Sequence, residues 1–443
     1  SSAAVAIVAE HLPRFRSTLA VQFGDDLPDF VRDELRGMAE CGDFGLGFVQ
    51  LRCSGCEASL RVPFSCKSRG ICPSCMGRRM GETGALLVDH RLPVVPYRQW
   101  VLTFRGPMSA RLGYDCKLLS RVCASLSKRV GQVLRRRVQA AHGVLRRADL
   151  NPAVLVVVQR FRMDLGLFVH LHCLVADGCF LDSGEVRFLK QAGLCEADLE
   201  AVLAKVYRDL EDELHEPVEV DAGLRACLAT SESEREHLPS APRPAKKMTV
   251  DAYGMQLHAA VRIKGDDRAA LERICRYLLR PPFAQDAIEA LPDGRVRVHF
   301  KAPMRNGRSF CEMSRDSFVA KLAALVPPPR FSFVRYYGVL ASQHRLRELV
   351  RPKCVDGERQ LKLFGVRPFV SEEGIEDFRF VRESGRKQNE RAPTRIRWAD
   401  LLARVFEIDV RRCGACGGRL RVVEVVGLER GVADGGARGP PAR

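Results

Sequence analysis

Residues 169–175 read Val-His-Leu-His-Cys-Leu-Val, and the rest of the chain can be interpreted outward from this stretch. In a β-strand, side chains two positions apart point to the same face, so His170 and His172 would project together. The apolar residues after them predict a mostly buried strand that ends at the turn pair Asp177-Gly178. Two imidazoles on one strand face could hold a divalent ion, although the same pattern also occurs by chance.

The charge of the chain favours a polyanionic partner. Lysines and arginines number 71 against 54 acidic residues, which gives the 443-residue chain a formal net charge of +17. An excess of this size most often indicates nucleic-acid binding. The length suits about two to four domains. We find neither an apolar run of about 18 residues nor a signal-peptide pattern, so we expect no membrane contact and a cytoplasmic location.

The 17 cysteines cluster in pairs, which indicates metal binding rather than disulfides. Two pairs lie near the N-terminus and are separated by 15 residues (57–71): Cys53-x-x-Cys56 and Cys72-x-x-Cys75. Together they predict one tetrahedral, structural zinc site. Cys66 could replace one of the four ligands, serve a second ion with Cys41, or simply be a small buried residue. A single pair near the C-terminus, Cys413-x-x-Cys416, is half a zinc site, and the sequence does not reveal its partner ligands.

The histidine strand belongs to a predicted hairpin. A β-branched strand from Val154 to Phe161 is followed by a turn at residues 164–166 and by the return strand 168–176. Across this ladder Gln159 could lie near His170 and His172. A long basic helix is predicted over residues 114–145, and its Arg135 and Arg136 are candidates for phosphate contact. Residues 185–215 are predicted to be helical, and residues 230–247 to be a polar linker.

A second candidate site lies on a helix expected from Asp267 to Arg280. Asp266 is its predicted N-cap, and Pro281-Pro282 ends it. Arg273, Arg276 and Arg280 share one face and are predicted to bind DNA, and Tyr277 lies between that face and the apolar stripe. Tyr277 is either a packed aromatic residue or a phenol held among guanidinium groups.

These patterns predict an α+β chain in four parts. We expect an N-terminal helical segment at 1–40, a small cysteine-rich zinc-binding domain at 41–95, a domain of strands and helices at 96–340, and a basic, partly disordered C-terminal region at 341–443 that carries the last CxxC pair. A short helix is expected at 398–406.

Four motifs follow one another in the chain: Cys53-x-x-Cys56 … Cys66 … Cys72-Pro73-Ser74-Cys75, Gln159-Arg160-Phe161 before His170-Leu171-His172, Arg276-Tyr277-Leu278-Leu279-Arg280-Pro281-Pro282, and Arg335-Tyr336-Tyr337-Gly338. In this order they closely resemble the rolling-circle transposases of the insertion sequence 91 family, in the HUH endonuclease superfamily. The resemblance runs from about residue 5 to 420. It implies an HUH-type domain with a central antiparallel sheet flanked by helices, preceded by the family's zinc-binding domain.

The resemblance also implies roles for individual residues. His170 and His172 would bind a catalytic magnesium or manganese ion, completed by a polar third ligand. We predict Gln159 in that position, with Asp164 and Glu272 as weaker alternatives. Tyr277 would attack a phosphodiester of single-stranded DNA at the transposon ends or in the target, which leaves a 5′-phosphotyrosine and a free 3′-OH. Tyr253, Tyr336 and Tyr337 are the other candidate nucleophiles.

One departure from the family pattern is informative. Some members carry a second tyrosine four residues before the first, where this chain has Arg273. The chain therefore resembles a single-tyrosine branch, in which a second strand transfer would reuse Tyr277 or use a second subunit of a homodimer. Two alternatives remain open: a replication initiator or relaxase with the same chemistry, and an inactive zinc-dependent DNA-binding protein. A transposase would be associated with the nucleoid when bound to DNA.

Overall fold

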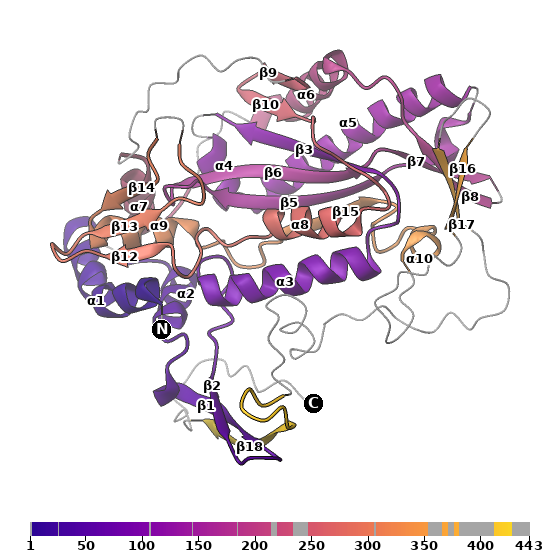
Figure 1. The fold of residues 1–443 in the computed structure, drawn as a ribbon. Helices are drawn as coiled ribbons and strands as arrows, with labels where there is room; N and C mark the ends of the chain where they lie inside the picture. The colour runs from indigo at the N-terminus through magenta and orange to yellow at the C-terminus, as the bar shows by residue number, and fades with distance from the viewer. Residues whose placement is uncertain are drawn as a thin grey trace.

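A central antiparallel sheet of seven strands positions the histidine strand (Figure 1). The computed structural model describes residues 2–24, 26–105, 108–143, 145–183, 185–213, 219–233, 247–304, 307–352, 366–370, 376–380 and 412–427. Within these ranges the strand order is β15-β5-β6-β3-β10-β9, with β11 paired to β3. The strands are β3 (Tyr97–Phe104), β5 (Ala153–Phe161), β6 (Leu167–Ala176), β9 (Thr249–Ala252), β10 (Met255–His258), β11 (Arg262–Ile263) and β15 (Val334–Gly338). The predicted α+β class is confirmed.

The predicted hairpin is β5 and β6, and its register places Gln159 opposite His170. Side chains along β5 and β6 alternate between the two faces of the sheet, so these strands contribute to two separate core clusters. Leu155 and Leu174 pack in one cluster with residues of α3 and α8, whereas Val156 and Leu171 pack in the other with residues of α5. Helices therefore cover the sheet on both sides. They include α3 (Pro73–His90), α4 (Met108–Tyr114), α5 (Cys116–His142) and α8 (Arg268–Leu278).

The N-terminal helices pack against a later part of the chain. Helices α1 (Ala3–Phe23) and α2 (Asp29–Ala39) contact each other and α9 (Arg315–Leu325), and α9 also contacts α7 (Ala222–Ser233) (Figure 1). Beside them lies a three-stranded sheet of β12 (Ile288–Ala290), β13 (Val296–His299) and β14 (Phe310–Met313). The residues at 1–40 thus share their core with residues of the large domain.

Two further sheets join segments that are distant in sequence. One has the order β18-β1-β2 and contains β1 (Gly47–Cys53), β2 (Ser59–Pro63) and β18 (Leu420–Gly427). The other has the order β16-β17-β8-β7-β4 and contains β4 (Leu150–Asn151), β7 (Gly178–Ser183), β8 (Glu185–Lys190), β16 (Val366–Val370) and β17 (Glu376–Phe380). The remaining helices are α6 (Glu196–Leu210), α10 (Arg347–Val350), η1 (Phe44–Leu46), η2 (Arg147–Asp149) and η3 (Glu211–Glu213).

Several predicted boundaries were wrong. Residues 185–190 form a strand rather than the start of a helix, because Val186 and Phe188 alternate into the core. The basic helix predicted over residues 114–145 is α5, which begins at Cys116 because the side chain of Asp115 caps it, and ends at His142. The N-cap of α8 is Asp267 rather than Asp266. The expected helix at 398–406, most of the predicted linker and the expected C-terminal disorder lie outside the described residues.

No helix in the described parts of the chain is long and apolar enough to span a membrane.

Candidate active site and metal centres

The histidine pair lies beside Gln159 on one face of the central sheet. The rings of His170 and His172 are 4.9 Å apart between centroids, and His172 is only 4% exposed. Gln159 is 2% exposed and lies directly across the ladder from His170. The structure therefore brings together the three residues that the sequence predicted for a catalytic metal.

The hydrogen bonds around His170 leave two electron pairs facing each other. Its Nδ1 is 3.0 Å from the backbone oxygen of Phe168, an acceptor, so Nδ1 carries the proton and Nε2 a lone pair. That Nε2 is 3.1 Å from Oε1 of Gln159. The amide cannot simply reverse, because its Nε2 donates to the backbone oxygens of Tyr277 at 3.1 Å and Leu278 at 2.7 Å. Two acceptors at this distance repel each other unless a cation lies between them.

His172 adds a third atom without a hydrogen-bond donor to this group. Its Nε2 is buried and has no hydrogen-bond partner among the described residues. Its Nδ1 lies 3.0 Å from the Nε2 atom of Gln99, on β3. If the Gln99 amide is reversed, its oxygen accepts from Nδ1–H and the Nε2 lone pair is left available for a ligand. Sequence reasoning missed Gln99, although a buried glutamine inside an apolar strand was a usable signal.

Burial keeps both imidazoles neutral at pH 7. Desolvation, together with a smaller effect of the positive charge of Arg280, lowers the pKa of His170 to about 4 and that of His172 to about 3. Neutral imidazole is the form that binds a metal.

Tyr277 is close to the histidines and exposed to solvent. Its side chain is 42% exposed, and its ring centroid is 6.0 Å from that of His172. Two cations flank the ring: the Arg280 guanidinium at 5.1 Å and the Lys301 ammonium at 5.8 Å from the centroid. Lys301 was missed because it lies beyond β13, far from α8 in sequence. Arg273 is exposed one turn before Tyr277, whereas Arg276 contacts Gly84 of α3.

The other candidate nucleophiles lie in different surroundings. Tyr253 stacks on Tyr207, with centroids 4.8 Å apart. Tyr336 and Tyr337 lie on β15, where burial raises the pKa of both phenols, that of Tyr337 to about 12. Among the described tyrosines, Tyr277 is the one whose ring contacts the histidine pair.

Several candidate side chains already have partners within the protein. Arg135 donates to the backbone oxygen of Leu150 at 2.7 Å, and Arg136 pairs with Asp198. Asp164 pairs with Arg162 at 3.0 Å in the hairpin turn, so it is a weaker metal ligand than Gln159. Phosphate contact by Arg135 and Arg136 stays a prediction.

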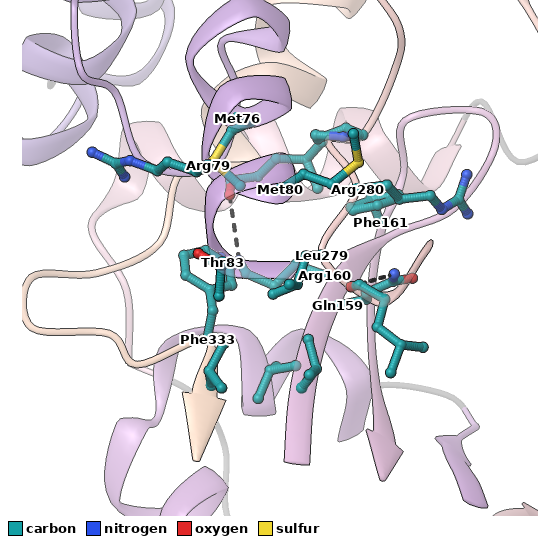
Figure 2. A pocket seen from close by; sticks show the side chains of 17 residues that line it. Met76, Arg79, Met80, Thr83, Gln159, Arg160, Phe161, Leu279, Arg280 and Phe333 are labelled. Atoms are coloured by element: carbon teal, nitrogen blue, oxygen red, sulfur yellow. Dashed lines mark hydrogen bonds between the residues drawn. The ribbon is translucent and has the colours of Figure 1, made fainter. Parts of the chain in front are cut away.

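A cavity of about 120 Å³ adjoins Gln159 (Figure 2). It lies between α3, the end of β5 and the segment that follows α8. Figure 2 shows the mostly apolar side chains that line it, including Met76, Met80, Phe161 and Phe333. Gln159 therefore lines this cavity and also contacts His170.

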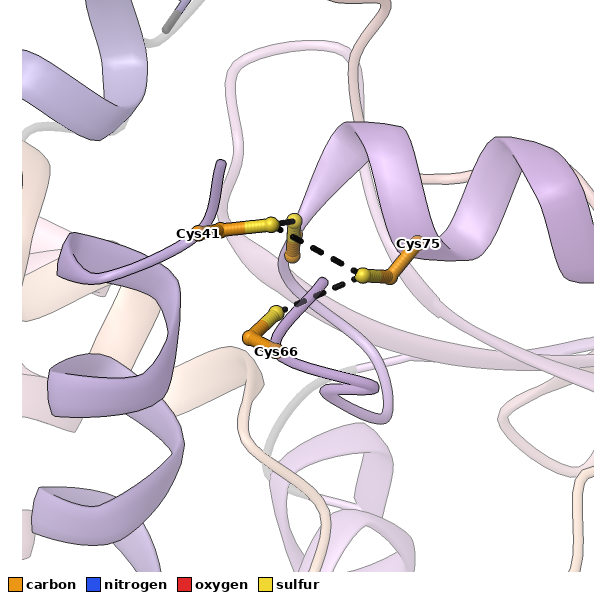
Figure 3. Close-up of side chains that lie close together, drawn as sticks. Cys41, Cys66 and Cys75 are labelled. Atoms are coloured by element: carbon orange, nitrogen blue, oxygen red, sulfur yellow. Dashed lines mark hydrogen bonds between the residues drawn. The ribbon is translucent and has the colours of Figure 1, made fainter. Parts of the chain in front are cut away.

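Four thiols gather at the start of α3 (Figure 3). They belong to Cys41, Cys66, Cys72 and Cys75. The Sγ atom of Cys75 is 3.8 Å from that of Cys41 and 3.4 Å from that of Cys66. Sulfurs about 3.8 Å apart are what a tetrahedral zinc with bonds of about 2.3 Å requires. Contacts with the Cys66 and Cys72 thiols lower the pKa of Cys41 to about 7.

The second group of thiols corrects the predicted zinc site. Cys53 and Cys56 lie with Cys413 and Cys416, not with the pair Cys72-x-x-Cys75. The spacing of the two N-terminal pairs predicted that they share one zinc ion. In the structure, however, Cys53 and Cys56 lie at the end of β1 and in the turn after it, and the α3 group does not include them. Cys66 and Cys41, which the sequence left open, complete the group around α3.

Comparison with known families matches both parts of the chain. Residues 7–104 match the family "Transposase zinc-binding domain", and residues 153–347 match the family "Putative transposase". The first range holds six of the eight clustered cysteines, and the second holds the histidine pair, Gln159 and Tyr277. No curated protein and no solved structure matches the chain. The matched zinc-binding domain and the four-cysteine groups support structural zinc.

Proposed function

Because the chain belongs to the insertion sequence 91 family of transposases, we propose that it nicks and rejoins single-stranded DNA at the ends of a mobile element. The proposed intermediate is a 5′-phosphotyrosine at Tyr277, as in rolling-circle transposition. The observation that carries this proposal is the contact between the Tyr277 and His172 rings, beside the facing acceptors of His170 and Gln159 and the buried, unpartnered Nε2 of His172.

The acceptor atoms suit a divalent cation. Nε2 of His170 and Oε1 of Gln159 are 3.1 Å apart, close to the roughly 3 Å between adjacent ligands of a metal with bonds of about 2.1 Å. Nε2 of His172 would be the third ligand. Two nitrogens and one amide oxygen are compatible with magnesium or manganese, and such an ion would polarise the scissile phosphate when bound.

The chain's own residues supply the nucleophile and its electrostatic setting. The Tyr277 oxygen attacks phosphorus, the bond from phosphorus to O3′ breaks, and the phenolic proton leaves as the 3′-oxygen gains one. Arg280 and Lys301 lie close enough to stabilise negative charge on the phenolate and the phosphate. The new phosphotyrosine replaces one phosphodiester, so attack by a 3′-OH can reverse the step without another energy source.

The surroundings of Tyr277 also provide DNA contacts. We propose that Arg273 and Arg276, with Arg280, bind the backbone of the single strand, since arginine recognises phosphate well. One tyrosine per chain must act twice or cooperate with a second copy to complete both strand transfers.

Replacing Tyr277 with Phe tests the nucleophile. The experiment incubates full-length protein and manganese with labelled single strands that carry the element ends, and separates covalent adducts on a denaturing gel. Tyr277→Phe should lose adducts by at least a hundredfold and still bind the strand, because only the attacking oxygen is removed. Tyr253→Phe is the matched control and should form adducts at the wild-type level.

Adducts that persist in Tyr277→Phe would show that another residue is the nucleophile. Absence of adducts from the wild-type protein on every strand would favour the inactive DNA-binding alternative. Adducts on a plasmid origin, but not on element ends, would favour the replication initiator or relaxase.

A further inference from the structure

The thiols of Cys53, Cys56, Cys413 and Cys416 come from opposite ends of the chain. The Sγ atoms of Cys53 and Cys416, 363 positions apart in sequence, are 3.5 Å from each other. Cys56 and Cys413 repeat this distance across 357 positions. All four sulfurs lie within 4.8 Å of one another. Four convergent thiols from two CxxC turns form the ligand set of a structural zinc.

The backbone around these sulfurs is shaped to leave room for them. A Cβ atom at Gly418 would lie 2.9 Å from Sγ of Cys53 and 3.1 Å from Sγ of Cys416, so only glycine fits there. The amide of Gly55 donates to Cys53 Sγ at 3.3 Å, and the amide of Gly418 donates to Cys416 Sγ at 3.4 Å. Such hydrogen bonds stabilise thiolates.

Side-chain packing alone does not explain why β18 docks on β1. The valines of β18 stay largely outside the core: Val422 is 60%, Val423 52% and Val425 64% exposed. Small exposed sheets without a buried face are marginal in water. A cross-link at the Cys53 end of the sheet would supply the missing stability, as metal does in other small domains.

We propose that these four cysteines bind a second zinc ion that fastens the C-terminal segment 412–427 to the N-terminal strands β1 and β2. This site is separate from the one at the start of α3, and half of its ligands lie outside the matched zinc-binding domain at 7–104. It does not depend on the tyrosine chemistry. In the absence of its zinc, β18 leaves β1.

The test counts zinc in full-length protein purified under reducing conditions without added metal. Elemental analysis should give two zinc ions per chain for the wild type, one for each double variant Cys413→Ser/Cys416→Ser and Cys53→Ser/Cys56→Ser, and two for the control Cys116→Ser/Cys195→Ser. The control removes two thiols that belong to neither group.

A second measurement tests whether zinc keeps segment 412–427 attached to β1. Limited trypsin digestion should cut after Arg419 or Arg421 at least tenfold faster in Cys413→Ser/Cys416→Ser than in the control, while thermal unfolding of the rest stays cooperative. The proposal is overturned by one zinc in the wild type, by two in either cysteine variant, by equal cleavage rates, or by mass-spectrometric detection of disulfides among these four thiols.

Discussion

At the scale of single residues, the buried side chain of Gln159 makes contacts with both the tyrosine helix and the histidine strand. Its amide nitrogen binds the backbone oxygens of Tyr277 and Leu278, and its amide oxygen faces His170. One buried side chain thus links the end of the tyrosine helix to the histidine strand. The acceptor that it presents to His170 is one that the proposed cation would require.

Replacing Gln159 with Leu should affect stability and metal dependence together. The backbone oxygens of Tyr277 and Leu278 lose their donor, which costs about 2 kcal/mol of unfolding free energy. The loss of Oε1 as a proposed ligand should raise the manganese concentration needed for half-maximal adduct formation about tenfold or more. Urea titration and adduct assays over a range of manganese concentrations measure the two effects.

Gln256→Leu serves as the control, because Gln256 bonds Asp251 at the surface. It should change the unfolding free energy by no more than about 0.5 kcal/mol. If Gln159→Leu loses stability but keeps its manganese requirement, Gln159 positions Tyr277 and is not a ligand.

At the scale of elements, α3 connects the first cysteine group to the tyrosine helix. Its N-terminal turn holds Cys75, and further along Gly84 contacts Arg276 of α8. A Cβ atom at Gly84 would lie 3.0 Å from Cγ of Arg276, so the two helices approach closely there. The helix that carries Cys75 therefore also packs against the helix that carries the proposed nucleophile.

A larger side chain at Gly84 should displace α8 and slow the chemistry. Gly84→Leu is expected to lower the unfolding free energy by about 1–3 kcal/mol through overpacking and to slow adduct formation at least tenfold. Zinc content should remain that of the wild type. Denaturant titration, adduct kinetics and elemental analysis measure these three quantities.

Gly77 offers the same substitution on the same helix in open space, since a Cβ there meets no atom within 4 Å. Gly77→Leu should be neutral or stabilise the protein by up to about 1 kcal/mol, because leucine favours helix. Equal adduct rates in the two variants would show that the contact between α3 and α8 does not position Tyr277.

At the scale of the whole molecule, the net charge of +17 favours binding to DNA, but the arginines that contribute to it differ in their availability. Many arginines are already paired within the fold, as Arg136 is with Asp198. Arg273, in contrast, is exposed beside Tyr277. Binding should therefore depend on the arginines near the proposed active site more than on total charge.

Salt dependence of single-strand binding can separate these two kinds of arginine. With about five phosphate contacts, affinity should fall about a hundredfold between 50 and 200 mM salt. Arg273→Gln should reduce the slope of log affinity against log salt by about 0.7. Fluorescence anisotropy measures the slope, and Arg129→Gln is the comparison, because the Arg129 guanidinium is largely buried against Asp209. An unchanged slope in Arg273→Gln would remove Arg273 from the DNA site.

The sequence by itself determined the local parts of this protein. Alternation predicted the hairpin and placed Gln159 near His170, because the period of a strand and a short turn leave little freedom of register. Apolar spacing and the prolines predicted the tyrosine helix to within one or two residues. Each CxxC pair was visible as a metal-binding turn for the same local reason.

Only the tertiary structure decided which of these parts meet. Spacing joined Cys53-x-x-Cys56 to the next pair along the chain, whereas the fold joins it to Cys413-x-x-Cys416. Likewise Gln99 lies next to His172 because β3 pairs with β6, and Lys301 lies near Tyr277 from the segment after β13. No short sequence pattern predicts either contact. The physical reason is that the packing of the whole chain determines which cysteines come together and which strands pair. Contacts across some 360 residues therefore carry no local signature.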